Sequence, residues 1–355
     1  MEKRLAKLRE KLAENNLDAA FLYSKENRRY ISAFTGSTGY VIVTADKAFF
    51  VTDFRYREQA KQQCQGFEVV IHGSSLIEQL KEIVVNSGIK NMGIEEGFMT
   101  VAFYENLKNS FGNVELMNLK GIMDELRLFK DAEEIEQIAK AASIADAAFE
   151  HILGFIKPGK TELEVAVELE YFCKKNGAAA MSFDSIVASG VRSSLPHGVY
   201  SEKVINNGEF LTLDFGCVYN GYCSDMTRTV FVGKADEKQK EIYNTVLKAQ
   251  QAALEYIKPG MLGKDVDKIA RDIITAAGYG ENFGHGLGHG VGLAVHEEPR
   301  LSPLGDKTLG ANMVVTDEPG IYIAEYGGVR IEDLVLVTED GHRVLSKSPK
   351  HLIEL

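Results

Sequence analysis

The chain has 355 residues, of which 45% are hydrophobic and 26% are charged, the composition of a soluble globular protein large enough for two domains. Its formal net charge of −11 disfavours nucleic acid and anionic membrane surfaces as partners. No apolar run is long enough to span a membrane, and the charged start MEKRLAKLRE does not look like a signal peptide, so we expect a cytoplasmic protein. The four cysteines form no CxxC pair, which predicts free thiols and no cysteine-bound zinc.

The first third of the chain has the pattern of an α/β domain. Its periodicity predicts a helix over residues 1–16, a strand over 18–24 and a hairpin over 40–53, and short strands then alternate with helices to about residue 118. There is no glycine-rich phosphate loop and no cluster of catalytic residue types. We therefore predict a domain over residues 1–124 that carries no catalytic constellation of its own.

A second domain is predicted over residues 125–355. Asp131 begins a long amphipathic helix, and Pro158–Gly159 should end it. Thr161 and Glu164 have the spacing of a capping box, which predicts that another helix begins at once. Two helices in succession therefore open this domain.

A weak internal repeat runs through the second domain. The segment FIKPGKTELEVAVELEYFCKKNGA at residues 155–178 recurs later as YIKPGMLGKDVDKIARDIITAAGY. The same order continues, with PHG matching VHE and LTLDFG matching VVTDEPG, so that His197 corresponds to His296 and Asp214 to Glu318. We predict two helix–helix–sheet units that face each other, each supplying two carboxylates to a site between them.

A hairpin in the first of these units brings two acids together. LTLDFGCVY and YCSDMTRTVFV are β-prone runs that flank Asn220–Gly221, a pair typical of a type I′ turn. In the register of a two-residue loop, Asp214 and Asp225 lie on one face as diagonal neighbours, with Cα atoms about 7–8 Å apart. Taken alone, this pair is read equally well as metal ligands or as two solvated acids near a turn.

Three more candidate ligands follow in distinctive strings. They are His289 in GHGVGLAVHEE, Glu318 in VVTDEPG and Glu332 in GVRIEDLVLV. Five glycines among residues 284–292 favour close backbone approach over a helix around the histidine. Each residue alone has an ordinary structural reading, but with the hairpin aspartates they make four carboxylates and one imidazole. That set suits two divalent cations, because buried carboxylates must be paired, metal-bound or protonated.

These strings resemble a known family. SLPHG, LDFG, CSDMTRT, GHGVGLAVHEEP, DEPGIY and GVRIED make residues 125–355 similar to the pita-bread metallopeptidases, which include methionine aminopeptidase, aminopeptidase P, prolidase and creatinase. NRRYISAFTGSTGY and TDFRY make residues 1–124 similar to the creatinase/prolidase-type N-terminal domain, which methionine aminopeptidases lack. The resemblance implies an α+β fold: a smaller α/β N-terminal domain followed by a pita-bread catalytic domain with a pseudo-twofold repeat.

The resemblance also implies a metal site. Residue by residue, it assigns two divalent metal ions to Asp214, Asp225, His289, Glu318 and Glu332. Members of this type usually use Mn²⁺ and sometimes Co²⁺ or Zn²⁺. Oxygen-rich ligation with a single imidazole fits Mn²⁺ on grounds of hardness.

Further residues match positions that contact substrate in the family. His197 and His296 match two histidines that are not ligands and that contact the substrate and the reacting carbonyl, and Glu318 matches the proposed proton shuttle. His285 matches a histidine that lines the proline pocket. Arg330 matches an arginine near the metals and the substrate.

The activity implied is metal-dependent hydrolysis of the bond between an N-terminal residue and proline, carried out by a homodimer on Xaa-Pro dipeptides or on short peptides with proline second. We favour the dipeptidase over the aminopeptidase P reading. A creatinase-type C–N hydrolase, which does not keep the five ligands, and a non-catalytic peptide-binding protein are remoter alternatives. Two positions depart from many relatives: Ala294 stands where they often have an acid, and Asp317, which strand alternation points away from the metals, stands where they have an apolar residue.

Overall fold

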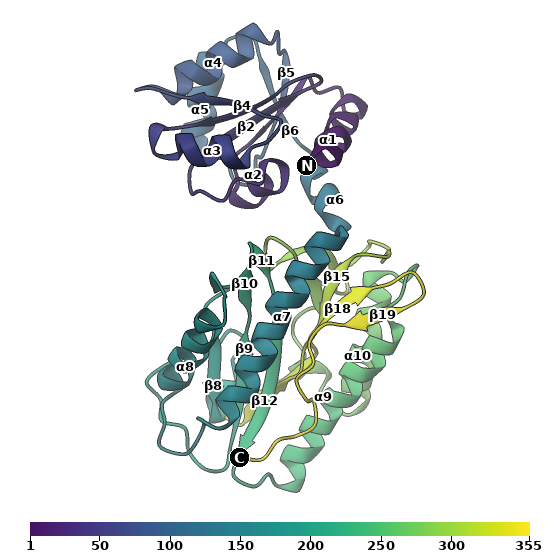
Figure 1. Cartoon of the computed structure of the whole chain (residues 1–355). Helices are drawn as coiled ribbons and strands as arrows, with labels where there is room; N and C mark the ends of the chain where they lie inside the picture. The colour runs from purple at the N-terminus through teal and green to yellow at the C-terminus, as the bar shows by residue number, and fades with distance from the viewer. The chain divides into compact units, whose positions relative to one another are not determined.

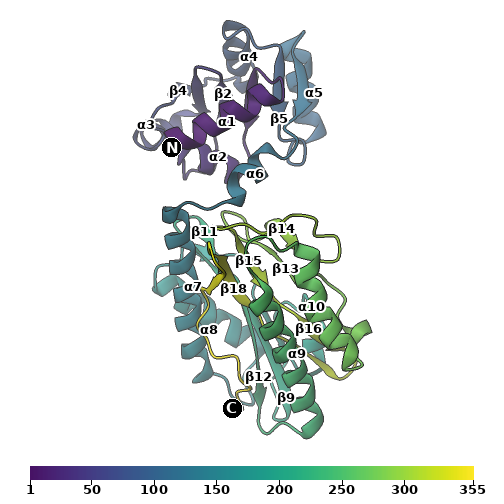
Figure 2. The same ribbon diagram turned by 90° about the vertical axis from the view of Figure 1, so that its right-hand side faces the viewer.

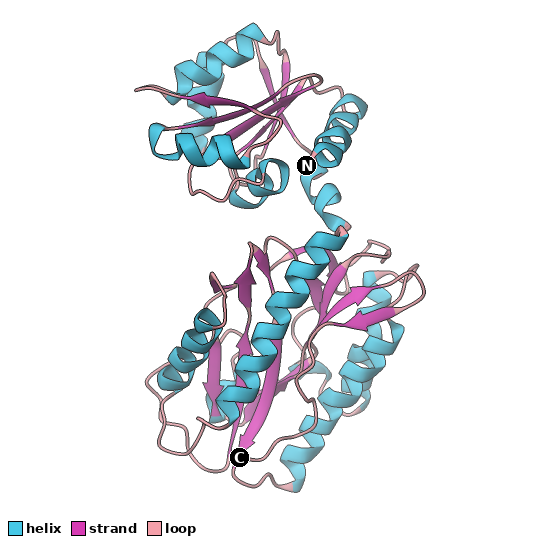
Figure 3. Cartoon of the chain, viewed as in Figure 1, coloured by secondary structure: helices cyan, strands magenta, loops and turns pink.

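The structure is a computed structural model that describes all 355 residues. The chain forms two compact units, Met1–Arg127 and Leu128–Leu355. Figures 1 and 2 show the ribbon in two views, and Figure 3 separates its helices from its strands. No helix in either unit is both long and apolar enough to cross a membrane.

The first unit is a six-stranded mixed sheet flanked by helices (Figure 3). The strand order is β4-β3-β2-β1-β5-β6, and β1 pairs antiparallel with β2 but parallel with β5. Helix α1 buries Leu5, Leu8 and Leu12, whose spacing forms one apolar stripe. The elements are α1 (Glu2–Glu14), β1 (Ala19–Leu22), α2 (Lys25–Ser32), β2 (Tyr40–Thr44), β3 (Ala48–Thr52), η1 (Phe54–Tyr56), α3 (Arg57–Gln63), β4 (Glu68–Ile71), α4 (Leu76–Asn86), β5 (Asn91–Ile94), α5 (Val101–Phe111), β6 (Glu115–Asn118) and α6 (Ile122–Leu128).

The second unit begins with two helices and two small sheets. The sheet orders are β11-β10-β7 and β12-β9-β8. Capping boxes at Asp131 and Thr161 begin α7 and α8. The elements are α7 (Ala132–Leu153), α8 (Glu162–Lys175), β7 (Ala180–Met181), β8 (Ile186–Ser189), η2 (Gly190–Ser194), β9 (Glu209–Phe215), β10 (Cys217–Tyr219), β11 (Tyr222–Cys223) and β12 (Met226–Val232).

The long helix α7 ends earlier than the sequence predicts. It stops at Leu153 rather than running to Pro158, because Gly154 caps it and bonds back to the carbonyls of His151 and Ile152. Burial of Ile156 then pulls the following turn into the core. The proline therefore follows the helix end instead of causing it.

The same order of elements recurs in the rest of the unit, so the predicted α+β repeat of two helices and a sheet is confirmed. A five-stranded sheet has the order β14-β13-β15-β18-β19, and β16 pairs with β17 beside it. The elements are α9 (Glu237–Tyr256), α10 (Gly263–Ala276), η3 (Gly280–Asn282), β13 (Gly288–Gly290), β14 (Glu297–Leu301), β15 (Val314–Asp317), β16 (Gly320–Ile323), β17 (Gly327–Arg330), β18 (Asp333–Val337) and β19 (His342–Val344).

Strand β9 separates two hydrophobic cores. Leu211 and Leu213 belong to the core that includes residues of α7 and α8, whereas Phe210 belongs to the core that includes residues of α9 and α10. Because side chains alternate along a strand, Asp214 lies on the same face as Phe210, toward the second half of the unit. The alternation thus directs a carboxylate into the interior between the two halves.

The hairpin has the predicted register with one interruption. Asn220 and Gly221 both have positive φ, of 44° and 79°, as a type I′ turn requires. Asp214 pairs with Thr227, as predicted. At Gly216 the two arms approach so closely that a Cβ atom would lie 1.9 Å from the carbonyl oxygen of Ser224. Only glycine fits there, and the ladder breaks into separate strands at this point.

Candidate metal centre

Three of the predicted ligands meet at the centre of the second unit. Asp214 is the penultimate residue of β9, Asp225 directly precedes β12, and Glu332 lies between β17 and β18. One carboxylate oxygen from each lies within 4.8 Å of the others. The three residues are only 8%, 5% and 2% exposed. Sequence segments more than 100 residues apart therefore supply one compact acidic cluster.

This cluster is not satisfied by the protein alone. Asp214 Oδ1 and Glu332 Oε1 are buried and accept no hydrogen bond. Burial, together with the neighbouring carboxylates, raises the pKa of Asp225 and of Glu332 well above the usual range. Buried oxygens without donors are rare in folded proteins and call for an ion or water. The carboxylate oxygens of the three residues are hard ligands of the kind that divalent cations prefer.

His289 and Glu318 lie at the edge of the cluster. His289 Nε2 is 3.2 Å from Glu318 Oε1 and 3.6 Å from Asp225 Oδ2. His289 Nδ1 lies 3.1 Å from the Gly290 carbonyl oxygen. Since a carbonyl only accepts, the proton on Nδ1 is fixed there and Nε2 is directed at the carboxylates. The imidazole is therefore presented as a metal ligand would be.

The protonation of this pair follows from its contact. Burial alone would raise the pKa of Glu318, but the hydrogen bond and charge of His289 outweigh it and bring that pKa to about 2. Burial likewise lowers the pKa of His289, and Glu318 more than reverses that effect. Thr316 Oγ1 donates to Glu318 Oε1 at 3.0 Å and accepts from the backbone N–H of His289 at 3.0 Å. Glu318 is thus held ionised and in place.

Arg330 connects the acidic cluster to two hydroxyl groups. Its Nη2 donates to Asp214 Oδ2 at 2.5 Å, its Nε to Thr227 Oγ1 at 3.0 Å and its Nη1 to Tyr322 Oη at 2.8 Å. Thr227 Oγ1 in turn donates to Glu332 Oε2 at 2.7 Å. One guanidinium therefore fixes the side chains of Asp214 and, through the threonine, Glu332. It pairs directly with only one of the three clustered acids, Asp214, and so balances only part of their charge.

The hydrogen bonds continue from Arg330 to His285. His285 Nδ1 is 2.7 Å from the Gly286 carbonyl oxygen, and its Nε2 is 2.9 Å from Tyr322 Oη. The tyrosine hydroxyl accepts from Arg330 and so donates to the imidazole. Burial raises the pKa of Tyr322 to about 12, partly offset by Arg330, and burial lowers the pKa of His285. Both groups are neutral near pH 7.

The two remaining predicted histidines lie nearby. The His296 ring stacks obliquely on the His289 ring, with centroids 4.2 Å apart. Burial lowers the pKa of His296, and the charges of His289 and His197 lower it further. His197 lies in the loop after η2, and its side chain is exposed. Like His296, it is exposed, whereas the five proposed ligands, His285 and Arg330 are at least partly buried.

Thr316 and Tyr322 are contacts that the sequence analysis missed. A local signal existed for Thr316, which lies two residues before Glu318 and so shares its strand face. Tyr322 follows Glu318 by four residues on the next strand, β16. Nothing in its own neighbourhood shows that it meets Arg330, because that contact depends on how β16 pairs with β17.

The opposite face of the same strands carries a second set of buried charges. Arg228 Nη2 donates to Asp333 Oδ1 at 2.8 Å, and Lys350 Nζ donates to Asp333 Oδ2 at 2.5 Å. Gln250 Nε2 donates to Asp317 Oδ2 at 3.0 Å and to Asp333 Oδ2 at 3.1 Å. Burial and the charge of Asp333 raise the pKa of Asp317 well above the usual range. Asp317 therefore points away from the cluster, as alternation predicts.

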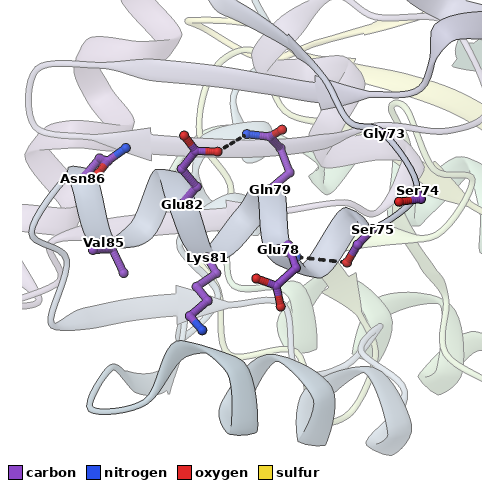
Figure 4. Close-up of a pocket in the computed structure, with 9 residues that line it drawn as sticks. All are labelled: Gly73, Ser74, Ser75, Glu78, Gln79, Lys81, Glu82, Val85 and Asn86. Carbon is purple, nitrogen blue, oxygen red and sulfur yellow. Dashed lines mark hydrogen bonds between the residues drawn. The ribbon is translucent and has the colours of Figure 1, made fainter.

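A shallow pocket in the first unit contains none of these residues. It is lined by polar side chains of α4 and by the preceding turn, where Ser75 caps the helix and Gln79 bonds to Glu82 (Figure 4). The lining residues are Gly73, Ser74, Ser75, Glu78, Gln79, Lys81, Glu82, Val85 and Asn86. The chemistry of the molecule is concentrated in the second unit.

An α+β unit built from two similar halves, with buried carboxylates and an imidazole converging between them, defines a metal-dependent hydrolase of the pita-bread type. Residues 136–339 match Metallopeptidase family M24, and residues 4–129 match the Creatinase/Prolidase N-terminal domain. The chain belongs to the M24 metallopeptidase family and is a peptidase.

Several relatives match over nearly their full length. The chain is 44% identical to a Xaa-Pro dipeptidase of Pyrococcus furiosus, covering 99% of this chain and 100% of that one. A solved structure of a Xaa-Pro dipeptidase from Bacillus anthracis matches with a TM-score of 0.98 and 49% identity, over 100% and 99% of the two chains. The X-Pro aminopeptidase from Thermotoga maritima matches with a TM-score of 0.90 and 39% identity, over 96% and 98%.

Proposed function

We propose that this protein is a Xaa-Pro dipeptidase that hydrolyses the bond between an N-terminal residue and proline. The observation that carries the proposal is the buried, unsatisfied carboxylate cluster in a chain whose full length matches dipeptidases of that name. The bond to proline is a tertiary amide without an N–H, which general peptidases handle poorly. A dedicated site is therefore reasonable.

Five residues are proposed to hold two divalent metal ions, Mn²⁺ first and Co²⁺ or Zn²⁺ as alternatives. They are Asp214, Asp225, His289, Glu318 and Glu332. The support is that the three clustered acids lack cationic partners for all their oxygens and that His289 Nε2 is aimed at the same space. When bound, such ions supply a Lewis acid for the carbonyl and lower the pKa of water towards about 7.

The remaining roles belong to the protein's own side chains. Glu318, ionised near pH 7, is suited to accept a proton from water and to pass it to the leaving proline nitrogen. His197 and His296 are proposed to donate hydrogen bonds to the substrate carbonyl as charge develops on its oxygen. His285 and Arg330 are proposed to bind substrate on the side of the proline ring, where Tyr322 connects them.

Aminopeptidase P activity on longer peptides is the second candidate, because a structure of that name also matches nearly the whole chain. The test is hydrolysis of a Xaa-Pro dipeptide and a Xaa-Pro-Yaa tripeptide side by side, with Mn²⁺ restored after chelation. Cleavage of the dipeptide alone supports the proposal, and preferential cleavage of the tripeptide supports the aminopeptidase. Cleavage of neither, with Co²⁺ also tried, contradicts both.

We also propose that the enzyme is a homodimer, as the resemblance to prolidases implies. Light scattering on the full chain tests this directly. A mass equal to one chain at micromolar concentration would contradict it.

A further inference from the structure

A buried carboxylate outside the metal centre holds both ends of one loop. Glu162, the first residue of α8, is fully buried. Its Oε1 accepts from the N–H and hydroxyl of Ser189, at 2.8 and 2.9 Å. Its Oε2 accepts from the N–H and hydroxyl of Ser201, at 3.1 and 2.6 Å. Two serines that are twelve positions apart in the chain therefore meet at one side chain.

The loop between those serines carries His197. Arg192, within the loop, donates from Nε to Glu162 at 3.0 Å and from Nη2 to the Val199 carbonyl oxygen at 2.5 Å. Val199 lies two residues beyond the histidine. Because the His197 side chain is exposed, its direction depends on this loop backbone rather than on packing. The Glu162–Arg192 pair therefore holds the backbone on both sides of that histidine.

The second half of the unit has a comparable arrangement around His285. Asp267, buried on α10, binds Arg271 through both carboxylate oxygens at 2.8 Å and accepts the N–H of Leu287 at 3.0 Å. Arg271 donates onward to the carbonyl oxygens of Phe283 at 2.9 Å and His285 at 2.7 Å. The backbone on both sides of His285, and at His285 itself, is thus tied to one carboxylate–arginine pair.

The Glu162–Arg192 and Asp267–Arg271 pairs each hydrogen-bond to a loop that carries a histidine, but their residues come from different positions in the two halves. In the sequence repeat, Glu162 aligns with Gly263 and not with Asp267, and the arginine comes from the loop in the first half but from the helix in the second. In both halves, however, a buried acid of the second helix and an arginine hydrogen-bond to the backbone around one histidine. A common packing requirement alone would not place both pairs beside histidines that line the same site.

We propose that Glu162 and Asp267 are positioning residues, each of which, with its arginine, fixes the loop that presents one histidine to the substrate: His197 for Glu162 and His285 for Asp267. The roles of the two histidines rest on the proposed function, whereas the ordering of the loops does not. The negative charge is essential, because each carboxylate oxygen faces only donors. Replacing one carboxylate oxygen by an amide NH₂ keeps the shape of the side chain but places a hydrogen-bond donor against the donors that the oxygen had faced.

Hydrogen exchange of the full-length, metal-free protein tests the ordering of the loops. Glu162→Gln should speed amide exchange within residues 189–201 and leave 283–289 unchanged, and Asp267→Asn should do the reverse. Glu164→Gln, which can keep the capping box of the same helix, and Asp272→Asn, in an exposed pair with Lys268, are matched controls that should change neither segment. Faster exchange throughout the unit, or no change in either loop, would overturn the proposal.

Double-mutant cycles test the link to the histidines. On kcat/KM for a Xaa-Pro dipeptide, Glu162→Gln should cost on the order of 10- to 100-fold in the parent enzyme but little once His197→Ala is present. Asp267→Asn should behave in the same way with His285→Ala. In the crossed combinations, Glu162→Gln with His285→Ala and Asp267→Asn with His197→Ala, the fold losses in kcat/KM should multiply. Equal losses in every background would show a merely structural role and overturn the proposal. If the parent enzyme cleaves no Xaa-Pro substrate, the proposed function fails while the exchange result still decides the loop ordering.

Discussion

The buried carboxylates on the two faces of the strand pair β15 and β18 are paired to different extents. On one face, Asp333 is bonded by Arg228 and Lys350, and Gln250 joins it to Asp317. On the other face, Arg330 bonds directly to Asp214 and reaches Glu332 only through Thr227, and Glu332 retains a buried oxygen that accepts nothing. The adjacent residues Asp333 and Glu332 therefore differ. Both oxygens of Asp333 accept hydrogen bonds from cations, in what we call the closed network, although Asp317 Oδ1 in that network accepts none, whereas Glu332 keeps an oxygen that accepts nothing.

The difference shows how a protein can prepare a site for a cation. A buried acid that the protein pairs internally contributes to the fold, because removing it leaves its partners unpaired. A buried acid without a full set of donors is costly until an ion arrives. The contrast predicts that substitutions on the two faces will have different consequences, one for metal content and the other for stability.

The largest effect is expected on the open face. Glu332→Gln should lower the metal content and reduce kcat/KM by more than the roughly 10²–10³-fold that loss of one stabilising group in an active site costs. The reason is that occupancy of the site is lost together with the group. Metal analysis and hydrolysis of a Xaa-Pro dipeptide measure both quantities. Full metal content in the variant would refute the ligand assignment.

The neighbouring substitution on the closed face should act on stability instead. Asp333→Asn leaves Arg228 and Lys350 without their shared carboxylate, and we expect a loss of about 3–5 kcal/mol in the free energy of unfolding. The metal content of the folded fraction should stay near that of the parent protein. Urea unfolding and metal analysis of the same sample separate the two outcomes. A drop in metal content without a drop in stability would contradict the prediction that Asp333 contributes to stability and not to metal binding.

A smaller effect is expected from pH in the metal-free protein. Asp225 and Glu332 have pKa values raised above those of the unfolded chain, so their contribution to stability is complete at low pH and is lost as pH rises through the folded pKa. Glu318, with a pKa of about 2, acts in the opposite sense and loses its contribution only as pH falls towards that value. Since metal needs ionised carboxylates, the increase in Tm on adding Mn²⁺ should grow between about pH 5 and pH 8. A constant increase would argue against metal binding at these acids.

The smallest effect is expected at the end of the hydrogen-bond chain. Tyr322→Phe removes one hydroxyl between Arg330 and His285, and we expect kcat/KM to fall by no more than about tenfold, because a single neutral hydrogen bond contributes about 1 kcal/mol. Metal content should not change, since Asp214 keeps its bond to Arg330. A loss as large as that of Glu332→Gln would mean that the tyrosine contributes directly to the reaction.

Much of the fold was accessible from local signals. The Asn220–Gly221 turn sets the register of its hairpin by loop length alone, so the pairing of Asp214 with Thr227 could be counted along the chain. The capping box of Thr161 and Glu164 likewise marked the start of α8, and Asp131 was placed correctly at the start of α7. The end of α7 was misjudged, because Gly154 and the burial of Ile156 stop the helix before Pro158 is reached.

The strand pairing that brings together the acids of the second half was less accessible. The acids Glu318 and Glu332 approach each other because β15 pairs with β18 across the β16–β17 hairpin, and no local pattern fixes that pairing. The internal repeat and the family resemblance stood in for this missing information. Neither indicated the closed network, since Asp317 acquires its partner Gln250 from a helix 67 residues earlier in the chain.

The Asn220–Gly221 turn also has a consequence for the ageing of the protein. Asparagine is a thermolabile residue, and a following glycine leaves its side-chain amide open to attack by the next backbone nitrogen. Asn220 is exposed, and its amide donates to Gln137 at 2.9 Å. Conversion to isoaspartate would insert an additional backbone atom into a two-residue loop whose length aligns Asp214 with Asp225. The register that places the two aspartates on one face therefore depends on the chemical integrity of a turn outside the acidic cluster.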